Sequence, residues 1–282
     1  MLSLRVRSQT TPERSAPSAT ADAAGERSES LQERLLPCGW LDLARQILVF
    51  AAAYGAYSVV RAFAEANGSI AFDHANEIIA LERSLHIFAE PQIQAWAMGS
   101  HLLIDVVSWV YVNAQTTLAI AALVFIYFRR HTSYRRVRDQ LVIAMGIALV
   151  GYALFPTAPP RFLPEWGFVD TVANTTGVTG AHADASMTGL VNPYAAVPSM
   201  HVAVACLLGF ELAKIARARA ARVLWRLYPV AIAFVVIVTA NHFLFDVATG
   251  ALAAALSAWL APRLAPLAWR LRSLYAPAEA AG

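Results

Sequence analysis

Charge, lysine and cysteine are all scarce in this chain. Charged residues make up 15% of its 282 residues, and Lys214 is its only lysine. The net charge of +3 is not gathered into a basic surface with aromatic or groove-reading elements, so we exclude nucleic acid as a partner. The two cysteines, Cys38 and Cys206, suggest neither a disulfide framework nor a metal site. We interpret them as packing thiols.

Hydrophobic residues, by contrast, make up 58% of the chain and are concentrated in long runs. Such runs are typical of helices that span a bilayer. We therefore predict an all-α integral membrane protein with a six-transmembrane-helix bundle. Five or seven spans stay open, because the third run is short and only a polar break at Asn241 and His242 separates the last two. The runs are Leu41 to about Ala64, and about 102–128, 140–156, 198–214, 226–241 and 243–262.

The positions of the apolar runs divide the chain into three regions. Residues 1–36 are rich in Ser, Thr, Ala, Glu, Arg and Pro without apolar periodicity, which predicts a disordered cytoplasmic tail. They contain no apolar core with a cleavage site, so we expect no removable signal peptide, and the first run becomes an uncleaved anchor. Residues 37–265 form the membrane domain, and 266–282 form a cytoplasmic C-terminal tail.

The basic residues indicate how the chain is oriented. They cluster in the loop at 129–138 and in the loop at 214–226, which should be cytoplasmic by the positive-inside rule. The segments 65–100 and 157–197 contain one arginine each and should face outward. We expect a multi-pass protein of the cell membrane with both termini inside.

The outward segment before the second run has a helical pattern of its own. A short amphipathic helix on the outer membrane surface fits this spacing. Its apolar residues are Ala75, Ile78, Ile79, Leu85 and Phe88, while Glu77, Glu82 and Arg83 lie elsewhere around the helical wheel.

Two outward segments contain residues suited to binding phosphate. Arg161 follows Pro159 and Pro160, and its planar guanidinium matches phosphate oxygens; the alternative is a surface arginine that contacts headgroups. Ser199 is suited to cap a helix that begins just before His201, and a helix N-terminus favours an anion. The alternative for His201 is an interfacial histidine facing the loop.

A third segment pairs a histidine with a carboxylate. His242 and Asp246 are four residues apart, so on a helix they share a face. A carboxylate that accepts from one imidazole nitrogen leaves the lone pair of the other free, as a nucleophile requires. An acidic residue near the start of an apolar span also needs a partner or a function. The alternative is a helix-capping Asp beside an unrelated histidine.

Together these residues describe a phosphoryl-transfer site at the outer face. Arg161 and backbone amides would bind the oxygens, one histidine would attack, and the other would protonate the leaving group. We expect no metal and no cofactor. A zinc site formed by His201, His242 and Asp246 is the alternative, but it lacks the tight local ligand pair typical of such sites.

The pattern resembles the type 2 phosphatidic acid phosphatase superfamily. More narrowly, it resembles the branch that contains fungal inositol phosphorylceramide synthase and its bacterial relatives. The resemblance covers roughly residues 40–265. It rests on Pro-Pro-Arg161, on Pro198-Ser199-Met200-His201, on Asn241-His242 with Asp246 and Gly250, and on the outer segment from Ala75 to Trp96.

The resemblance implies a role for each matched residue. His242 would attack phosphorus and form a phosphohistidine, and Asp246 would orient it. His201 would protonate the departing oxygen and then deprotonate the water or alcohol that resolves the intermediate. Arg161 and Ser199 would bind phosphate oxygens. The fold implied is a six-helix bundle with the site at its outer end.

The chain departs from the family pattern at two expected phosphate ligands. Leu154 stands where a Lys or Arg is usual, and Val235 and Val236 stand where Ser-Arg is usual. The inositol-phosphotransferase branch tends to lack these ligands too, so the departures favour that branch. Arg83 is our candidate for the missing positive charge. Met200 replaces a commoner glycine, which would narrow the approach to His201.

The residues leave two kinds of function open. The first is an enzyme acting on a lipid phosphate or phospholipid, either a phosphatase using water or a phosphotransferase using a lipid or sugar hydroxyl as acceptor. Phosphatidic acid, a polyprenyl phosphate and phosphatidylinositol with a sphingolipid acceptor all remain possible substrates. The second is a non-enzymatic lipid carrier or scaffold of the same fold, which the intact His201, His242 and Asp246 disfavour.

Overall fold

The computed structural model describes residues 39–65, 68–176 and 194–274. The chain divides into two compact units, Met1–Gln46 and Ile47–Gly282. In the first unit the described residues are the opening turns of α2 (Gly39–Glu65), where Gln46 Nε2 donates to Asp42 Oδ1 at 2.9 Å. The tail predicted for residues 1–36 lies outside the described residues, as do residues 275–282 of the predicted C-terminal tail.

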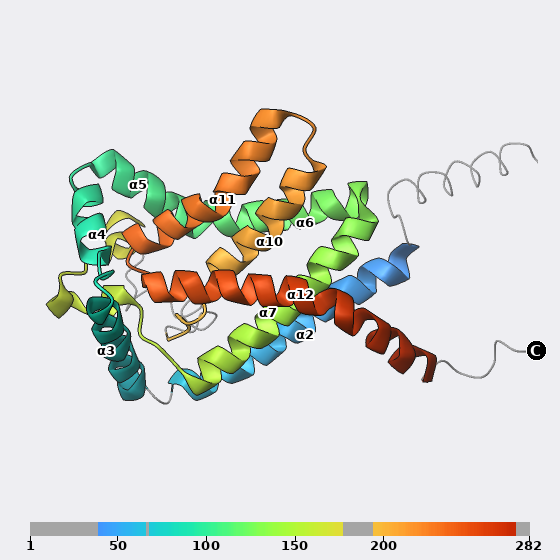
Figure 1. Ribbon diagram of the computed structural model, residues 1–282, viewed down its shortest axis with the longest axis horizontal. Coiled ribbons are helices and arrows are strands. Elements are labelled where there is room, and N and C mark those ends of the chain that lie inside the picture. The colour runs from blue at the N-terminus through green and yellow to red at the C-terminus, as the bar shows by residue number, and fades with distance from the viewer. Residues whose placement is uncertain (1–38, 66–67, 177–193, 275–282) are drawn as a thin grey trace, which may run out of the picture. The chain divides into compact units, whose positions relative to one another are not determined.

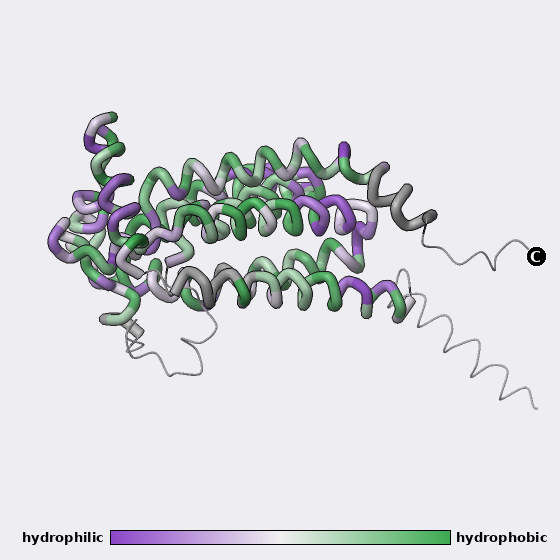
Figure 2. Tube along the Cα trace, turned by 90° about the horizontal axis from the view of Figure 1, so that it is seen from below, coloured by the Kyte–Doolittle hydropathy of each residue, from purple (hydrophilic) through white to green (hydrophobic). Residues whose placement is uncertain are grey.

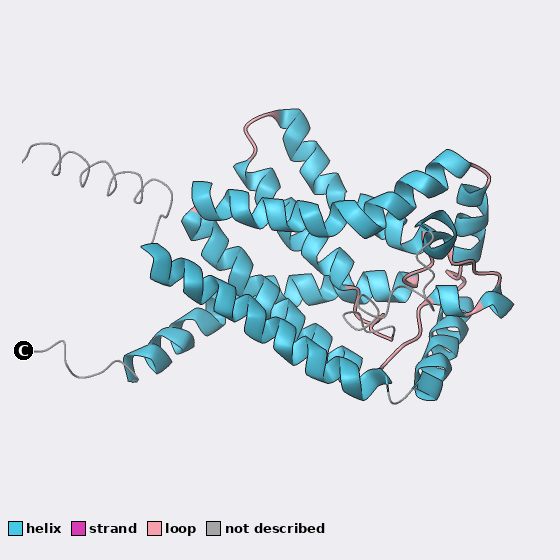
Figure 3. Cartoon of the chain, turned by 180° about the vertical axis from the view of Figure 1, so that it is seen from behind, coloured by secondary structure: helices cyan, strands magenta, loops and turns pink. Residues whose placement is uncertain are grey.

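Within the described parts of the chain all regular structure is helical, as Figures 1 and 3 show, so the all-α prediction is confirmed. The α-helices are α2, α3 (Gly68–Ser84), α4 (Glu90–Met98), α5 (His101–Trp109), α6 (Gln115–Arg129), α7 (His131–Leu154), α8 (Thr171–Thr176), α10 (Met200–Ile215), α11 (Arg219–Val238) and α12 (Leu244–Leu274). A π-helix, η1 (Val110–Ala114), joins α5 to α6, and two 3₁₀ turns, η2 (Pro160–Phe162) and η3 (Pro164–Trp166), follow α7.

Each of the six predicted apolar runs is helical, but fewer have the length and composition of a membrane span. Among the described residues three do: α7, α11 and the Leu244–Pro266 part of α12. A fourth is obtained if α4 and His101–Asn113, bent by 115°, form one broken span. The second predicted run is interrupted by η1, and α10 has only 16 residues. Six spans therefore remain a prediction.

The surface of the long helices is suited to a bilayer. Large apolar side chains are exposed on several of them: Leu154 on α7 is 76% exposed, Val230 on α11 is 65% exposed and Trp259 on α12 is 54% exposed. Figure 2 shows hydrophobic residues along the long helices and more hydrophilic ones near their ends. Exposed apolar side chains in such number indicate a surface that contacts lipid.

Helix α10 is the most enclosed element, since ten of its sixteen residues are buried. It packs against α6, α7, α11 and α12. Two glycines allow Pro198 and Ser199, which precede α10, to pack closely against α7 and α12. A Cβ at Gly250 of α12 would overlap the carbonyl oxygen of Ser199, and one at Gly151 of α7 would lie 2.7 Å from Pro198 Cδ. The start of α10 is therefore held between α7 and α12.

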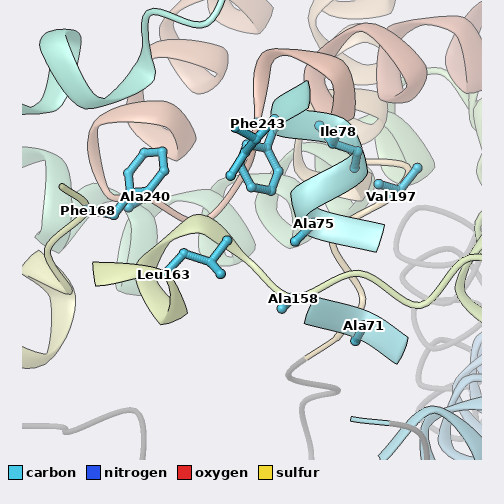
Figure 4. Packing of buried hydrophobic residues seen from close by; sticks show 10 residues of the cluster. Ala71, Ala75, Ile78, Ala158, Leu163, Phe168, Val197, Ala240 and Phe243 are labelled. Carbon is cyan, nitrogen blue, oxygen red and sulfur yellow. The ribbon is translucent and has the colours of Figure 1, made fainter. Parts of the chain in front are cut away.

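The predicted amphipathic helix forms, and other parts of the protein cover its apolar face. Figure 4 shows Ala71, Ala75 and Ile78 of α3 beside Ala158, Leu163 and Phe243 in one buried cluster. The helix also ends at Ser84, so Leu85, predicted on the apolar face, is 58% exposed. A second helix, α4, follows. Helix α3 thus supports the segment that follows α7 and the turn before α12.

Candidate functional site

The turn between α11 and α12 (residues 239–243) places His242. After α11, the backbone N–H groups of Asn241 and His242 both donate to the carbonyl oxygen of Val236, at 3.0 and 3.2 Å. Ala240 adopts a left-handed conformation with φ of 51°, which an L-residue rarely does and which costs about 1–3 kcal/mol. This conformation reverses the chain and directs the imidazole of His242 into the protein, where it is buried.

His242 is held by Asp246. Its Nδ1 lies 3.2 Å from Asp246 Oδ2, and the same oxygen accepts the backbone N–H of Phe243 at 2.9 Å. The sequence predicts that His242 and Asp246 share a helix face; instead α12 begins at Leu244, so His242 precedes the helix and Asp246 reaches back to it from the first turn. With Nδ1 as the donor, Nε2 keeps its lone pair.

The free nitrogen of His242 faces the second predicted histidine. His242 Nε2 lies 3.3 Å from His201 Nδ1. His201 is the second residue of α10, whose N-cap is Ser199, as predicted. The Ser199 Oγ accepts the backbone N–H of Val202 at 3.5 Å, and the Ser199 N–H donates to the carbonyl of Asp246 at 3.1 Å. Backbone contacts thus join the two histidine-bearing segments directly.

Arg161 lies beside this pair. Its backbone N–H donates to the carbonyl of Ala240 at 2.8 Å, and its guanidinium donates to Oδ1 of Asn241, the neighbour of His242. Its Nε is also 3.9 Å from Asp170 Oδ2, and the group lies over the ring of Phe162. The side chain is 17% exposed, so its charge acts where solvent screening is reduced.

The electrostatic environment keeps His242 neutral. Burial, together with the positive charge of Arg161, lowers the pKa of His242 to about 3, while a backbone hydrogen bond with Ala196 acts in the opposite direction. A neutral imidazole has a lone pair available for attack at physiological pH, which an imidazolium does not.

Arg83, the remaining predicted residue, is placed differently. It is exposed, and its guanidinium lies 5.4 Å from the ring centroid of Trp166 in η3. The contacts found among the described residues do not join it to His201, His242 or Arg161. The structure thus brings together five of the six predicted site residues.

Several residues at the site were not predicted from the sequence. Asn241 fixes the guanidinium of Arg161 while its own Nδ2 donates to Thr239 Oγ1 at 2.9 Å. The ring of Tyr111, in η1, lies 5.1 Å from that of His201, and π-helical turns are often found at functional sites. Two buried carboxyls, Glu82 and Glu90, bind the start of α12. Glu82 follows Ala75, Ile78 and Ile79 at helical spacing, a pattern that could have indicated its burial.

These residues lie in a part of the chain that matches a known protein family. Residues 76–260, about two thirds of the chain, match the family model of the PAP2 superfamily. The chain belongs to the PAP2 superfamily. The matched part includes Arg161, Ser199, His201, Asn241, His242 and Asp246. No curated protein and no solved structure matches the chain.

Membership of the PAP2 superfamily indicates the general class of activity. It indicates a phosphatase or phosphotransferase that acts on lipid phosphates, and together with the apolar helices it indicates a multi-pass membrane protein. Among the described residues, no group of three or more His, Cys, Asp and Glu side chains is arranged to hold a metal ion. That the reaction is metal-independent stays a prediction.

Proposed function

We propose that this PAP2 protein is a metal-independent lipid phosphatase or phosphotransferase that acts through a phosphohistidine at His242. The observation that carries the proposal is the chain of contacts from Asp246 Oδ2 through His242 to His201 Nδ1, at 3.2 and 3.3 Å. It provides an oriented neutral nucleophile and, beside it, a second imidazole that can exchange a proton with the substrate.

The proposed reaction has two steps. In the first, the lone pair of His242 Nε2 forms a bond to phosphorus as the bond to the leaving oxygen breaks, and His201 gives that oxygen a proton. In the second, His201 removes a proton from water or an alcohol, whose oxygen attacks phosphorus as the N–P bond breaks. Asp246 accepts from Nδ1 throughout and stabilises the positive ring of the intermediate.

Substrate binding requires the two histidines to separate. At 3.3 Å, Nδ1 of His201 and Nε2 of His242 are in hydrogen-bond contact, which leaves no room for a phosphoryl group between them. In-line attack places the leaving oxygen on the far side of phosphorus from Nε2, so His201 has to move to reach it. The negative charge of the bound phosphate favours the protonated form of His201 that the first step needs.

The residues around the site favour a phosphodiester donor. Leu154, at one position where the family usually has a basic residue, is 76% exposed and apolar, and Val236, at the other, is fully buried. Among the described residues Arg161 is the arginine held beside the two histidines, and Ser199 at the N-terminus of α10 can assist it. Arg83 is exposed and stays a candidate for a second positive charge. A diester carries one negative charge and a monoester up to two, so a single arginine suits the diester. This supports the inositolphosphotransferase-like branch.

The proposed setting is the outer leaflet. The loop arginines favour an orientation with both termini in the cytoplasm. The start of α10 and the α11–α12 turn would then lie at the extracytoplasmic face, where a lipid headgroup can reach Arg161 and His242.

Product analysis of the purified protein tests the function. The protein is offered a panel of lipid phosphates, and phosphatidylinositol with and without ceramide or polyprenol, beside the His242→Ala variant. Free phosphate that the variant does not release identifies a phosphatase, and an acceptor-dependent new phospholipid identifies a transferase. Identical products from both proteins on every substrate would contradict the proposal and favour a non-enzymatic lipid carrier.

A further inference from the structure

Three consecutive backbone N–H groups at the start of α12 each bind a different carboxyl group. Phe243 donates to Asp246 Oδ2 at 2.9 Å, Leu244 donates to Glu90 Oε1 at 2.8 Å, and Phe245 donates to Glu82 Oε1 at 2.7 Å. The first turn of a helix leaves its N–H groups without intrahelical partners, and its dipole favours negative charge. Here side chains from α3 and α4 meet that need, more than 150 residues away along the chain.

The same three carboxyls are enclosed. Glu82 is 1% exposed, and Glu90 and Asp246 are 0% exposed. Their other oxygens, Glu82 Oε2, Glu90 Oε2 and Asp246 Oδ1, are buried and receive no hydrogen bond from a donor group in the described part of the chain. No Lys or Arg of that part forms an ion pair with them. Three buried negative charges without a cation are strongly unfavourable, so at least one carboxyl has to carry a proton.

The surroundings of Glu82 favour its protonated form. Burial raises its pKa to about 9, a hydrogen bond with Glu90 and the negative charges of Glu90 and Asp246 act in the same direction, and the N–H of Phe245 opposes them. Backbone N–H groups hold both Oε1 atoms, so the two buried Oε2 atoms, which no donor reaches, are the ones available for the hydrogen bond that raises the pKa of Glu82. Two carboxyl oxygens attract each other only when a proton lies between them.

We propose that Glu82 and Glu90 share one proton and that this pair fixes the first turn of α12, and with it Asp246 and His242. They are positioning residues: they hold the helix that carries Asp246, and the hydrogen bonds of the described residues do not join either of them to His242. The link to catalysis rests on the proposed function, whereas the shared proton does not depend on it.

Glutamine variants test the shared proton directly. In Glu82→Gln the amide oxygen can accept from Phe245 and the NH2 can donate to Glu90, as the protonated acid does; Glu90→Gln works in the same way. In the double variant an NH2 faces an NH2, and turning either amide would set its NH2 against a backbone N–H. We expect each single variant to melt within about 3 °C of the wild type in detergent and the double variant to melt at least about 5 °C lower.

Infrared spectroscopy provides a second measurement that does not depend on activity. The wild type at pH 7 should show the C=O band of a protonated carboxyl, and either single variant should lose that band. Glu77→Gln, an exposed position on the same helix, is the matched control and should keep it. A band that both single variants retain, or a double variant as stable as either single one, would overturn the shared proton.

The stability that Glu82 contributes should decrease as pH rises. Because the pKa of Glu82 is raised on folding, its contribution to stability is full below its unfolded value of 4.5 and is lost as pH rises through about 9. The titratable groups around it are Glu90 from α4, Asp246 from α12 and, beyond Asp246, His242. The melting temperature of the wild type should therefore fall between pH 7 and 10 more steeply than that of Glu82→Gln.

Activity measurements distinguish a role of Glu82 in positioning the site from a role in folding alone. With whichever substrate the lipid panel identifies, wild-type turnover should fall at alkaline pH as the shared proton is lost, and Glu82→Gln should resist that fall. Glu82→Ala should lose at least about tenfold in kcat at pH 7 with little change in KM, and Gln should restore it. An equal fall of turnover at alkaline pH in the wild type and in Glu82→Gln would contradict the positioning role. The infrared and melting data would still decide whether the two carboxyls share a proton.

Discussion

Asp246 binds His242 and the backbone N–H of Phe243 through one oxygen, Oδ2, at 3.2 and 2.9 Å. The carboxylate therefore orients the imidazole and holds the turn on which it stands. In the proposed reaction its charge has a separate role, because a positive ring would form when His242 bonds to phosphorus.

The substitution Asp246→Asn removes the charge of this side chain and keeps its shape. In Asp246→Asn the amide oxygen can still accept both hydrogen bonds, so the protein should remain folded. Turnover should fall about 10²- to 10⁴-fold, because the positive ring loses its counter-charge. Turnover measured beside the melting temperature distinguishes the two effects, and an Asn variant with more than half of wild-type activity would exclude the electrostatic role.

Arg161→Lys tests recognition of the phosphate. Lysine keeps the positive charge but loses the planar fork of donors, one of which is bound to Asn241. We expect kcat/KM to fall about 10²-fold or more, because the remaining charge cannot be aimed in the same way. Arg83→Lys, at an exposed position, is the comparison and should lose less. Equal losses at the two positions would count against Arg161 as the principal phosphate ligand.

Acid stability should depend on His242. Its folded pKa, about 3, is below the unfolded value of 6.5, so the unfolded chain binds the extra proton in this interval and stability is lost as pH falls from 6.5 toward 3. The loss from this group approaches about 1.4 kcal/mol per pH unit. Melting temperatures between pH 7 and 4.5 should fall less steeply for His242→Gln than for the wild type. An unchanged slope would show that His242 is not the group responsible, and His101→Gln, at an exposed position, serves as the control.

Cysteine labelling tests the orientation in the membrane. In a variant without Cys38 and Cys206, a cysteine is placed at Glu165 in η3 or at Arg217 between α10 and α11, both exposed. A membrane-impermeant maleimide should label position 165 in intact cells and position 217 only after lysis. The opposite pattern would place the candidate site in the cytoplasm.

The sequence predicted the helices, and it named five residues that the structure brings together, for clear physical reasons. Apolar runs determine helices, and His, Arg and Asp in otherwise apolar or proline-rich surroundings are conspicuous. The pairing of His242 with Asp246 was also predicted, although a capping contact produces it and not a shared helix face. Ser199 was expected and found as the N-cap of α10.

What the sequence did not reveal depends on long-range packing. Glu82 was placed away from the apolar residues of an amphipathic helix, yet it is buried, where it accepts the backbone N–H of Phe245 at the start of α12. That burial arises only when α3, α4 and α12 come together. The contact of Asn241 with Arg161 is likewise fixed by the left-handed turn at Ala240, which the surrounding apolar residues did not indicate.

Trapping the intermediate tests directly whether His242 is the nucleophile. The purified protein is mixed with a phosphate-labelled substrate from the lipid panel, quenched in alkali, where phosphohistidine is stable, and analysed by mass spectrometry of its peptides. We expect a phosphate-bearing adduct on His242 that is labile in acid, absent from His242→Ala, and increased in His201→Ala if water or alcohol attack becomes the slow step. Turnover with no adduct on His242, or an adduct on any other residue, would contradict the nucleophilic role of His242.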